Sequence, residues 1–372
     1  MKTPSVIVYY NRKTRGGHSR QIFTGFCELA RSGAIDLELA EDDWNPECGT
    51  QNLIKATVNG GIDLLFDTND GFYWIHDDLD RNIEYFSDRI LPRFRYVFKR
   101  SYNPELVARF GDSAAKFQPL GLNYELTSRH NAMDGIYFGW RDYLQRRARR
   151  SRTLCKALKK TPDQAFHFEN FEYPPLLNPE GSPPQVLLLT RLWGPVDGEV
   201  AAARPTAKER TQGQLDVINH TRIECVEACR AAFAGHFVGG LADTPYARKA
   251  APHLVAPDFI TAKQAFMALV KASPICIATT GVLQSTGWRF GEYLAASRAI
   301  VSEKLHDVLP GPFRTPDNYL EFLTVSELID AVRGLVDNRT ALRSMMWNNY
   351  AYYRSYGRPD SLVLNALLRV LD

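Results

Sequence analysis

The sequence predicts an α/β protein in which two strand–helix domains face a central cleft. The chain has 372 residues, which corresponds to two domains at roughly 150 residues each. Short apolar runs alternate with amphipathic segments of helical spacing, as in parallel sheets that are covered by helices. A segment rich in proline and glycine, FEYPPLLNPEGSPP at 171–184, separates two such series and is typical of an interdomain linker.

The composition is that of an ordinary folded protein. Hydrophobic residues make up 45% of the chain and charged residues 23%. The net charge of +3 is too small to indicate nucleic-acid binding by itself, and no apolar stretch approaches the roughly 20 residues of a membrane span. The six cysteines contain no CxxC pair, which argues against a zinc ribbon, and the first apolar run, VIVYY, is too short for a signal peptide. We therefore expect a cytoplasmic protein.

The first domain is expected over residues 1–125. Its predicted strands are SVIVYY, GIDLLFDTNDG, FRYVFKRSY and AKFQPLGLN, at 5–10, 61–71, 94–102 and 115–123. A helix is predicted after the first strand, over 19–33, because its apolar residues recur at helical spacing. Ser19 is the predicted N-cap of this helix and Gly33 its stop.

Residues 126–184 interrupt this alternation and are predicted to form a basic helical insertion and the linker. Nine of the twenty residues at 141–160 are Lys or Arg. Such a helix is commonly a solvated face. The functional alternative is contact of residues 140–160 with an anionic membrane surface or a charged glycan, which would make the protein membrane-associated.

The second domain is expected over 185–345. Its predicted strands are QVLLLTRLW, GHFVGGL, PICIATTG and AIVS, and its helices lie at 214–233, 262–273, 289–297 and 324–338. Thr324 and Glu327 fit a capping box at the start of the last of these helices. Two C-terminal helices follow over 346–372, and their return to the first domain is one option.

Ligands of open α/β sheets bind beyond the carboxyl ends of the strands, so residues at those ends are candidates for a site. In the first domain they are Gly16, Gly17, His18, Asp67, Asp70, Lys99 and Arg100. In the second they are Arg191, Gly239, Gly240, Thr279, Thr280, Gly281 and Glu292. Several also have a structural interpretation: Gly16, Gly17, Asp67 and Asp70 as turn formers, the basic residues as solvated groups, and His18 and Glu292 as residues of a first helical turn.

The segment EYLAASRAIV at 292–301 resembles the E-(A/Y)-L-A-x-G-x-P-V-V motif of glycosyltransferases of the GT-B fold. LLLTRLW and NYLEFLTVSELIDAVRGLVDN also resemble parts of the second domain of that family, and RGGHS and FQPLGLN resemble parts of its first domain. The resemblance implies two Rossmann-like domains around a cleft. It is strongest for polysaccharide-assembly transferases, including the spore-coat-protein-like group.

The resemblance also implies roles for particular residues. Glu292 would hold the ribose of a nucleotide-sugar donor, and Arg191 would meet its pyrophosphate. An earlier glutamate of the family corresponds to Gln284, so this chain departs from the retaining pattern. The implied donor site further includes Gly239, Gly240, Thr280, Gly281, Gly287 and Tyr293. Gly16, Gly17, Lys99 and Arg100 would lie on the acceptor or phosphate side.

The predicted chemistry is sugar transfer from a nucleotide-activated donor to a glycan, lipid-linked or other small acceptor. Arg191 and the amides at the start of the 289–297 helix would stabilise the departing phosphate without a metal. His18, Asp67 and Asp70 are the candidate catalytic bases for the acceptor hydroxyl. No tightly bound cofactor is expected, because the nucleotide sugar is a co-substrate. The alternatives are a nucleotide-sugar epimerase of the same fold and an inactive sugar- or nucleotide-binding protein. Nucleic-acid binding is not expected, because no recognised module is present.

Overall fold

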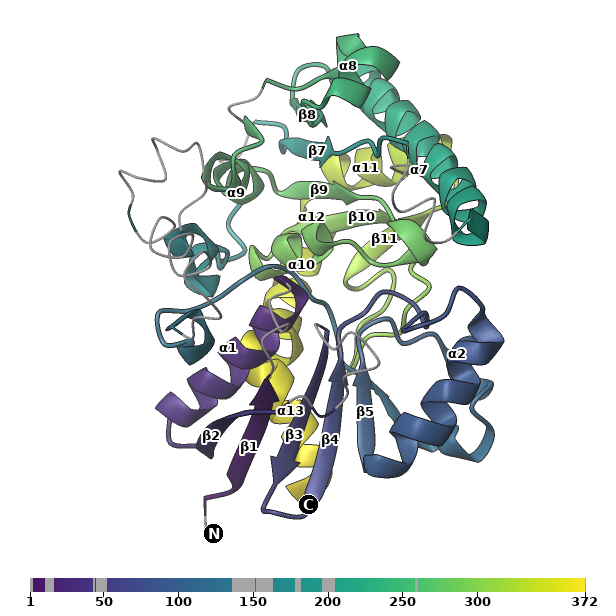
Figure 1. The fold of residues 1–372 in the computed structure, drawn as a ribbon. Coiled ribbons are helices and arrows are strands. Elements are labelled where there is room, and N and C mark those ends of the chain that lie inside the picture. The colour runs from purple at the N-terminus through teal and green to yellow at the C-terminus, as the bar shows by residue number, and fades with distance from the viewer. Residues whose placement is uncertain are drawn as a thin grey trace. The chain divides into compact units, whose positions relative to one another are not determined.

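The structure, a computed structural model, describes residues 3–10, 17–42, 44, 52–135, 151, 163–177, 182–195, 205–257 and 260–371. The chain divides into two compact units, which are coloured along the chain in Figure 1. The first unit contains residues 1–171, 307–311 and 354–372, and the second contains 172–306 and 312–353. Two late segments of the chain therefore return to the first unit.

The first unit is built on a sheet in the order β2-β1-β3-β4-β5-β6. The strands are β1 (Ser5–Tyr10), β2 (Asp36–Glu41), β3 (Leu53–Val58), β4 (Ile62–Asp67), β5 (Tyr96–Lys99) and β6 (Phe117–Pro119). Strand β3 runs antiparallel to both of its neighbours, and the other pairs are parallel. The four predicted strands are confirmed. Strands β2 and β3 were not predicted, and β3 makes this sheet mixed rather than parallel.

The helices of the first unit are α1 (Gly17–Arg31), α2 (Leu79–Tyr85), α3 (Pro104–Ala108) and α13 (Pro359–Leu371). Shorter helical segments are η1 (Phe86–Ile90), η2 (Leu91–Arg93), η3 (Gly111–Lys116), η4 (Ala132–Gly135), η5 (Asp163–Phe166) and η6 (Phe168–Asn170). Helix α1 begins two residues before Ser19, so the prediction of Ser19 as N-cap is wrong. Ser19 is the third residue of the helix, and its side chain is buried. Gly33 has a φ of +77° just after the helix, and the predicted stop is confirmed.

Helices α1 and α13 pack against each other although more than 300 residues separate them (Figure 1). The contact needs Gly25, because a Cβ at this position would lie 2.2 Å from the carbonyl oxygen of Pro359. Ile22 and Phe26 of α1 share a buried apolar cluster with Leu362 of α13. The last helix of the chain thus covers the sheet that the first strand begins.

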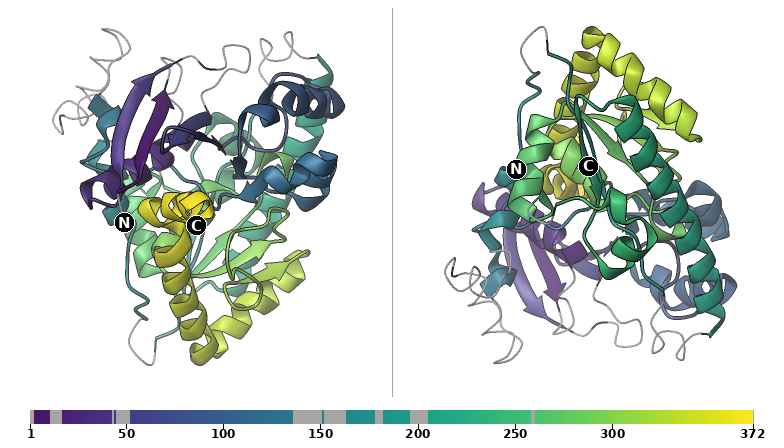
Figure 2. Two further views of the ribbon diagram at one scale, coloured as in Figure 1. Left: turned by 90° about the horizontal axis from the view of Figure 1, so that it is seen from below. Right: turned by 90° about the horizontal axis from the view of Figure 1, so that it is seen from above.

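The second unit has a wholly parallel sheet in the order β11-β10-β9-β7-β8. Its strands are β7 (Val186–Thr190), β8 (Phe237–Leu241), β9 (Ile275–Ala278), β10 (Ala299–Glu303) and β11 (Tyr319–Phe322). Its helices are α7 (Pro205–Ala232), α8 (Pro245–Ala250), α9 (Lys263–Ala272), α10 (Trp288–Ala295), α11 (Val325–Asp337) and α12 (Arg339–Tyr352). Short segments are η7 (Pro252–Leu254), η9 (Val282–Gln284) and η10 (Tyr353–Gly357). The four strands predicted here are confirmed, and Figure 2 shows the long helix α7 in teal.

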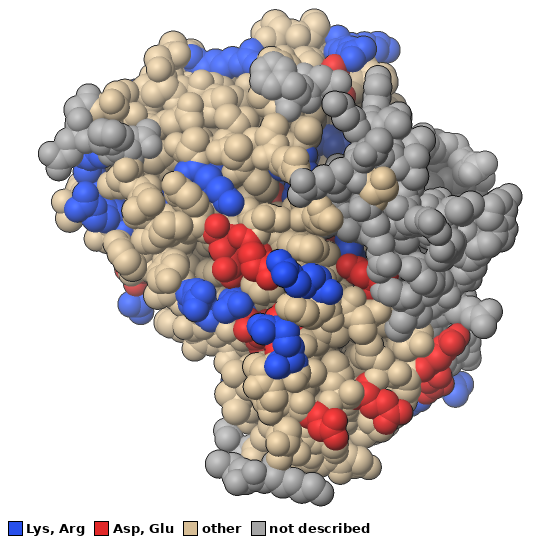
Figure 3. All heavy atoms as spheres, turned by 90° about the vertical axis from the view of Figure 1, so that its left-hand side faces the viewer, with Lys and Arg blue, Asp and Glu red and all other residues tan. Residues whose placement is uncertain are grey.

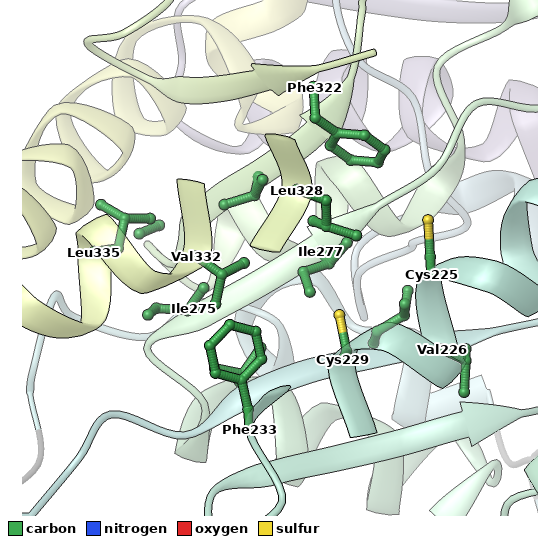
Figure 4. Close-up of a cluster of buried hydrophobic side chains, with 14 of the residues drawn as sticks. Cys225, Val226, Cys229, Phe233, Ile275, Ile277, Phe322, Leu328, Val332 and Leu335 are labelled. Carbon is green, nitrogen blue, oxygen red and sulfur yellow. The ribbon is translucent and has the colours of Figure 1, made fainter. Parts of the chain in front are cut away.

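One face of this sheet packs against α7 and α11, as Figure 4 shows. Cys225 and Cys229 of α7 point toward Ile277 of β9, and Val332 of α11 completes the cluster. Burial raises the pKa of the Cys229 thiol to about 12, so the thiol stays protonated at neutral pH. Both cysteines are thus buried free thiols on one face of α7.

Helix α11 begins with the predicted capping box, because the Thr324 side chain accepts from the Glu327 amide and Glu327 bonds back to the Thr324 amide. On the face shown in Figure 3, Lys and Arg side chains are interspersed with Asp and Glu over the described residues. Within the same described ranges, no helix is long and apolar enough to cross a membrane. The predicted basic helix at 140–160 lies outside the described residues, apart from Ser151.

Candidate functional site

An arginine from helix α7 joins the carboxyl ends of β7 and β9 in the second unit. Arg222 is largely buried, and its Nε donates to Thr279 Oγ1 over 3.0 Å. Its Nη1 donates to the carbonyl of Arg191 over 2.6 Å, and Nη2 donates to the carbonyl of Thr280 over 3.0 Å. All three acceptors follow parallel strands, so Arg222 holds two loops together at the edge where ligands of such sheets bind.

Two further guanidinium groups lie near Arg222. Burial, together with the nearby charges of Arg289 and Arg191, lowers the pKa of Arg222 to about 10. Glu303, at the end of β10, acts in the opposite direction and also accepts from the backbone amide of Thr280 over 2.6 Å. Three positive charges and one negative charge therefore meet at this edge of the sheet. An anion bound here would relieve the repulsion among the arginines.

Arg289 lies in the first turn of α10 and has one buried nitrogen without a partner in the described part of the chain. Its guanidinium lies 4.5 Å from the centre of the Phe266 ring. Its Nη1 is buried and has no hydrogen-bond partner among the described residues. The hydroxyl of Tyr293 lies beside it, and burial raises the pKa of this tyrosine far above its ordinary value while Arg289 lowers it. A buried N–H without a partner is costly and indicates a position for a ligand oxygen.

Glu292 forms a buried ion pair with Lys263, the first residue of α9. The Glu292 side chain is only 4% exposed and that of Lys263 is 15% exposed. Glu292 is the fifth residue of α10, so the interpretation as an acid of the first turn is wrong. The charge of the carboxylate is balanced inside the protein, and Lys263 brings a further cation to this part of the unit.

The loop from β9 to α10 carries four of the predicted donor residues, Thr280, Gly281, Gln284 and Gly287. The amide of Gly281 donates to the carbonyl of Ser285 over 2.9 Å, which closes a tight turn around η9. Within it, Leu283 and Gln284 have φ of +58° and +56°, a strained conformation for residues other than glycine. Gln284 is exposed, and Gly287 is the N-cap of α10. The loop follows directly on Thr280, which Arg222 and Glu303 hold in place.

The remaining predicted donor residues differ in their surroundings. Arg191 is exposed, with its guanidinium 5.1 Å from the Trp193 ring. Gly239 and Gly240 lie inside the edge strand β8 and not in a loop. A Cβ at Gly239 would lie 2.0 Å from the carbonyl oxygen of Leu188 in β7, and its φ is +134°. Close backbone packing therefore explains this glycine without any ligand.

In the first unit, the structure gathers His18, Asp70 and Arg100. His18 Nδ1 lies 2.8 Å from Asn123 Oδ1, and Asn123 Nδ2 donates to the His18 carbonyl over 2.7 Å. Burial and the charge of Arg100 together lower the pKa of His18 to about 4, and the hydrogen bond with Asn123 opposes this shift. Arg100 is itself buried and forms an ion pair with Asp70, and the charge of Asp307 lies close by. His18 is thus neutral at pH 7 beside a fixed positive charge.

Asp67 and Lys99 pair with each other beside this group. They form a fully buried ion pair of 3.1 Å, so Lys99 is not a solvated strand end. Asp67 also accepts from the Trp74 indole over 2.9 Å and from the Asn69 amide over 2.9 Å. A fully buried carboxylate with these partners supports the loop after β4 and is not placed to meet an acceptor. Gly17 begins α1, and Gly16 lies outside the described residues.

Four charged residues of these clusters were not predicted: Arg222, Lys263, Arg289 and Glu303. Arg289 and Glu303 flank the motif from Glu292 to Val301, and their charge at the two ends of that segment was a usable signal. Arg222 and Lys263 lie in helices without any local pattern that marks them. Over the described residues, no group of three His, Cys, Asp or Glu side chains could hold a metal ion.

Comparison with known proteins finds no matching family model and no matching curated protein. Among solved structures, HepE from Anabaena in complex with UDP and glucose is 10% identical, with a TM-score of 0.44 and coverage of 98% of this chain and 99% of that one. The C-terminal domain of the group 1 glycosyl transferase LpcC from Francisella tularensis is 14% identical, with a TM-score of 0.34 and coverage of 51% and 96%.

A UDP-GlcNAc 2-epimerase from Neisseria meningitidis, bound to UDP-GlcNAc, is 13% identical with a TM-score of 0.33. The match covers 75% of this chain and 62% of the epimerase, less than two thirds of its length. Because the three TM-scores are all below 0.5, the function proposed for this chain depends on the residues of its site, and the spore-coat-like subgroup stays a prediction.

Proposed function

We propose that the protein is a glycosyltransferase that moves a sugar from a nucleotide-activated donor to an acceptor hydroxyl, without a metal ion. The observation that carries this proposal is the gathering of Arg191, Arg222 and Arg289 at the carboxyl ends of parallel strands in the second unit. A nucleotide diphosphate develops negative charge as the sugar leaves, and fixed guanidinium groups stabilise that charge.

The arginines have separate tasks in this proposal. Arg222 donates to two backbone carbonyls and to the Thr279 hydroxyl, so it positions the loops and contributes charge. Arg289 offers a buried N–H to a phosphate oxygen, and exposed Arg191 can reach a second one. The nucleotide-sugar resemblance calls for a lysine soon after Arg191, but the next one along the chain is Lys208. We assign the binding of the donor pyrophosphate to Lys263, which is oriented by its ion pair with Oε1 of Glu292. The other carboxylate oxygen of Glu292, Oε2, would accept from a ribose hydroxyl.

The first unit would supply the acceptor side. Asn123 Oδ1 can only accept a hydrogen bond, so His18 carries its proton on Nδ1 and presents Nε2 as the basic nitrogen. This imidazole is neutral at pH 7 and can take up a proton on Nε2, and its lowered pKa makes it a weaker base than an ordinary histidine. Asp70 and Arg100 would fix the local charge around it. Of the three predicted bases, His18 has the geometry that best supports the role.

The wider setting is part of the same proposal. The acceptor would be a glycan or a lipid-linked or small molecule, used in polysaccharide assembly in the cytoplasm. The nine basic residues at 141–160 support contact with an anionic membrane surface. Retention of the sugar's anomeric configuration is not proposed, because Gln284 replaces the acid of the retaining pattern.

A thermal-shift titration of the full chain with UDP, GDP, CMP and TDP tests the donor site. A nucleotide at 100 times its Kd adds about 2.7 kcal/mol to the free energy of unfolding and raises Tm by several degrees. Arg289→Ala should weaken binding about 10- to 100-fold, because it removes a charge-assisted hydrogen bond. The control is Arg333→Ala in the same unit, since Arg333 is 55% exposed and pairs only locally with Asp330.

A flat response of the wild-type protein to all four nucleotides, or equal binding by Arg289→Ala, would refute the donor site. Donor turnover then separates the activities. A nucleotide sugar that is consumed only when an acceptor is added supports the transferase. A sugar that is isomerised without an acceptor indicates the epimerase, and binding without any turnover indicates an inactive module.

A further inference from the structure

The first unit contains a cavity of about 330 Å³ that is separate from the candidate site. It lies along the β5–β6 edge of the sheet, is partly open to solvent, and has α13 as part of its wall. Its lining includes Phe98, Gln118, Leu120, Tyr356, Asn365 and Arg369. None of these residues takes part in the donor or acceptor roles proposed above. The volume is at the lower end of the range of small-molecule sites.

One wall of the cavity is aromatic, and a glycine sets its position. The ring of Tyr356 lies directly over Gly311, where a Cβ would come within 2.3 Å of the ring. Gly311 also has a φ of +71°, which favours glycine. Phe98 and Leu120 extend the apolar part of the lining. Aromatic and aliphatic walls of this kind cover the C–H face of a small ring-shaped ligand.

The polar part of the lining consists of two amides and one cation. Asn365 Nδ2 donates to the carbonyl of Ser355 over 2.7 Å, and Gln118 Nε2 donates to the carbonyl of Ala115 over 3.3 Å. These bonds orient the amides and leave their side-chain oxygens as acceptors for hydroxyl groups. Among the described residues that line the cavity, Arg369 alone carries a charge. The lining thus matches a ligand with hydroxyl groups and one anionic group.

We propose that this cavity binds a small polyol with one anionic group, of the class of a hexuronate or a sugar phosphate. Arg369 would bind the carboxylate or phosphate, and the amides of Gln118 and Asn365 would accept from hydroxyls. Leu309, Pro310 and Gly311 also line the cavity, so its wall includes both segments that return to the first unit, 307–311 and 354–372. A bound ligand would join these two segments to β6 and stabilise the first unit.

Calorimetric titration of the full chain with D-glucuronate, D-glucose 6-phosphate, D-glucose and inorganic phosphate tests the proposal. The first two should bind with a Kd of roughly 1 mM or tighter, which is about −4 kcal/mol. Glucose and phosphate should each bind at least about tenfold more weakly, because each offers only half of the recognised groups. A preference between the first two probes distinguishes a carboxylate ligand from a phosphate ligand.

Arg369→Gln should weaken both anionic polyols at least about tenfold, and the matched control Arg343→Gln in the second unit should not. Both arginines are exposed, so both variants should fold, which melting curves can check. Ala366→Leu, which fills the cavity wall, is a second variant with the same expected loss. Equal binding of phosphate alone, unchanged binding by Arg369→Gln, or no heat with any probe would overturn the proposal.

This inference is independent of the proposed transferase activity. Arg369→Gln should leave nucleotide binding unchanged, and Arg289→Ala should leave glucuronate binding unchanged. The experiments can therefore refute either proposal without refuting the other.

Discussion

Lys263 at the start of α9 and Glu292 within α10 form a buried ion pair that joins two helices of the second unit. The partners are 29 residues apart in the sequence. The sequence analysis assigned Glu292 to the donor site without a partner, and the structure places the ammonium group of Lys263 beside it. It also links the stability of the second unit to the residues proposed to bind the donor.

Removing one member of this pair should be more harmful than removing both. Lys263→Met or Glu292→Gln leaves a buried charge or polar group without its partner and should lower the free energy of unfolding by about 3–5 kcal/mol. The double variant should recover part of that loss, because no uncompensated charge remains. Urea unfolding of the four proteins measures the coupling. Lys249→Met, at an exposed position of α8, is the control and should change stability by less than about 0.5 kcal/mol.

The lowered pKa of His18 predicts a pH dependence of stability. The folded-state pKa is about 4 and the ordinary value is 6.5, so the unfolded chain binds more protons between these values. The stability contributed by neutral His18 is fully present above pH 6.5 and is lost as the pH falls toward 4. The slope can reach about 1.4 kcal/mol per pH unit. His18→Gln should flatten the profile between pH 4 and 6.5, whereas His220→Gln, at a residue that is 74% exposed, should leave it unchanged.

The same pKa bears on catalysis. If His18 is the general base, the acid limb of kcat/KM should fall near pH 4, because this limb reports the free enzyme. Initial rates of sugar transfer from pH 3.5 to 8 measure it. An acid limb near pH 6.5, or a full rate in His18→Gln, would assign the proton transfer to another group.

Two glycine substitutions should have opposite effects. Gly239→Ala places a Cβ 2.0 Å from the carbonyl oxygen of Leu188 at a φ of +134°, so β8 must shift and the variant should lose several kcal/mol of stability, on the order of 3. Gly334 lies on the exposed face of α11 near its C-terminal end, where a Cβ would meet no atom beyond its own helix turn within 4 Å, so Gly334→Ala should stabilise the protein by about 0.5–1 kcal/mol. Thermal unfolding of both variants checks the difference in sign.

Arg298 bonds to the segment 172–177 at the start of the second unit, and we expect this segment to loosen when Arg298 is replaced. The residue has no exposed surface and donates to the carbonyls of Ala296 over 2.6 Å and Pro174 over 2.8 Å. Arg298→Met would leave these groups unsatisfied at about 1–3 kcal/mol each. Arg298→Lys should not restore stability, because an ammonium lacks the planar fork of donors. Limited proteolysis should then cut near 172–177, and resistance equal to that of wild type would contradict this assignment.

The sequence predicted elements whose signals are local. The buried strands of the second unit, the capping box of Thr324 and Glu327, and the stop at Gly33 each depend on a few neighbouring residues. Strand β2 was not predicted, because DLELAE is half-exposed and acidic and therefore has only a weak apolar pattern. Strand β3 could have been found, because the turn after it has positive φ at Asn59 and Gly60, and an Asn-Gly pair is a strong hairpin signal.

The sequence alone determined that the chain builds two parallel-rich α/β units, and it marked the loops after their strands as candidate sites. Only the tertiary structure decided which charged residues meet there. Arg222 reaches Thr279 across 57 positions of the chain, and Lys99 is neutralised by Asp67 in the core although both looked like surface groups. Helix and strand signals come from neighbours along the chain, whereas ion pairs and burial depend on strand order and helix packing, which bring distant residues together.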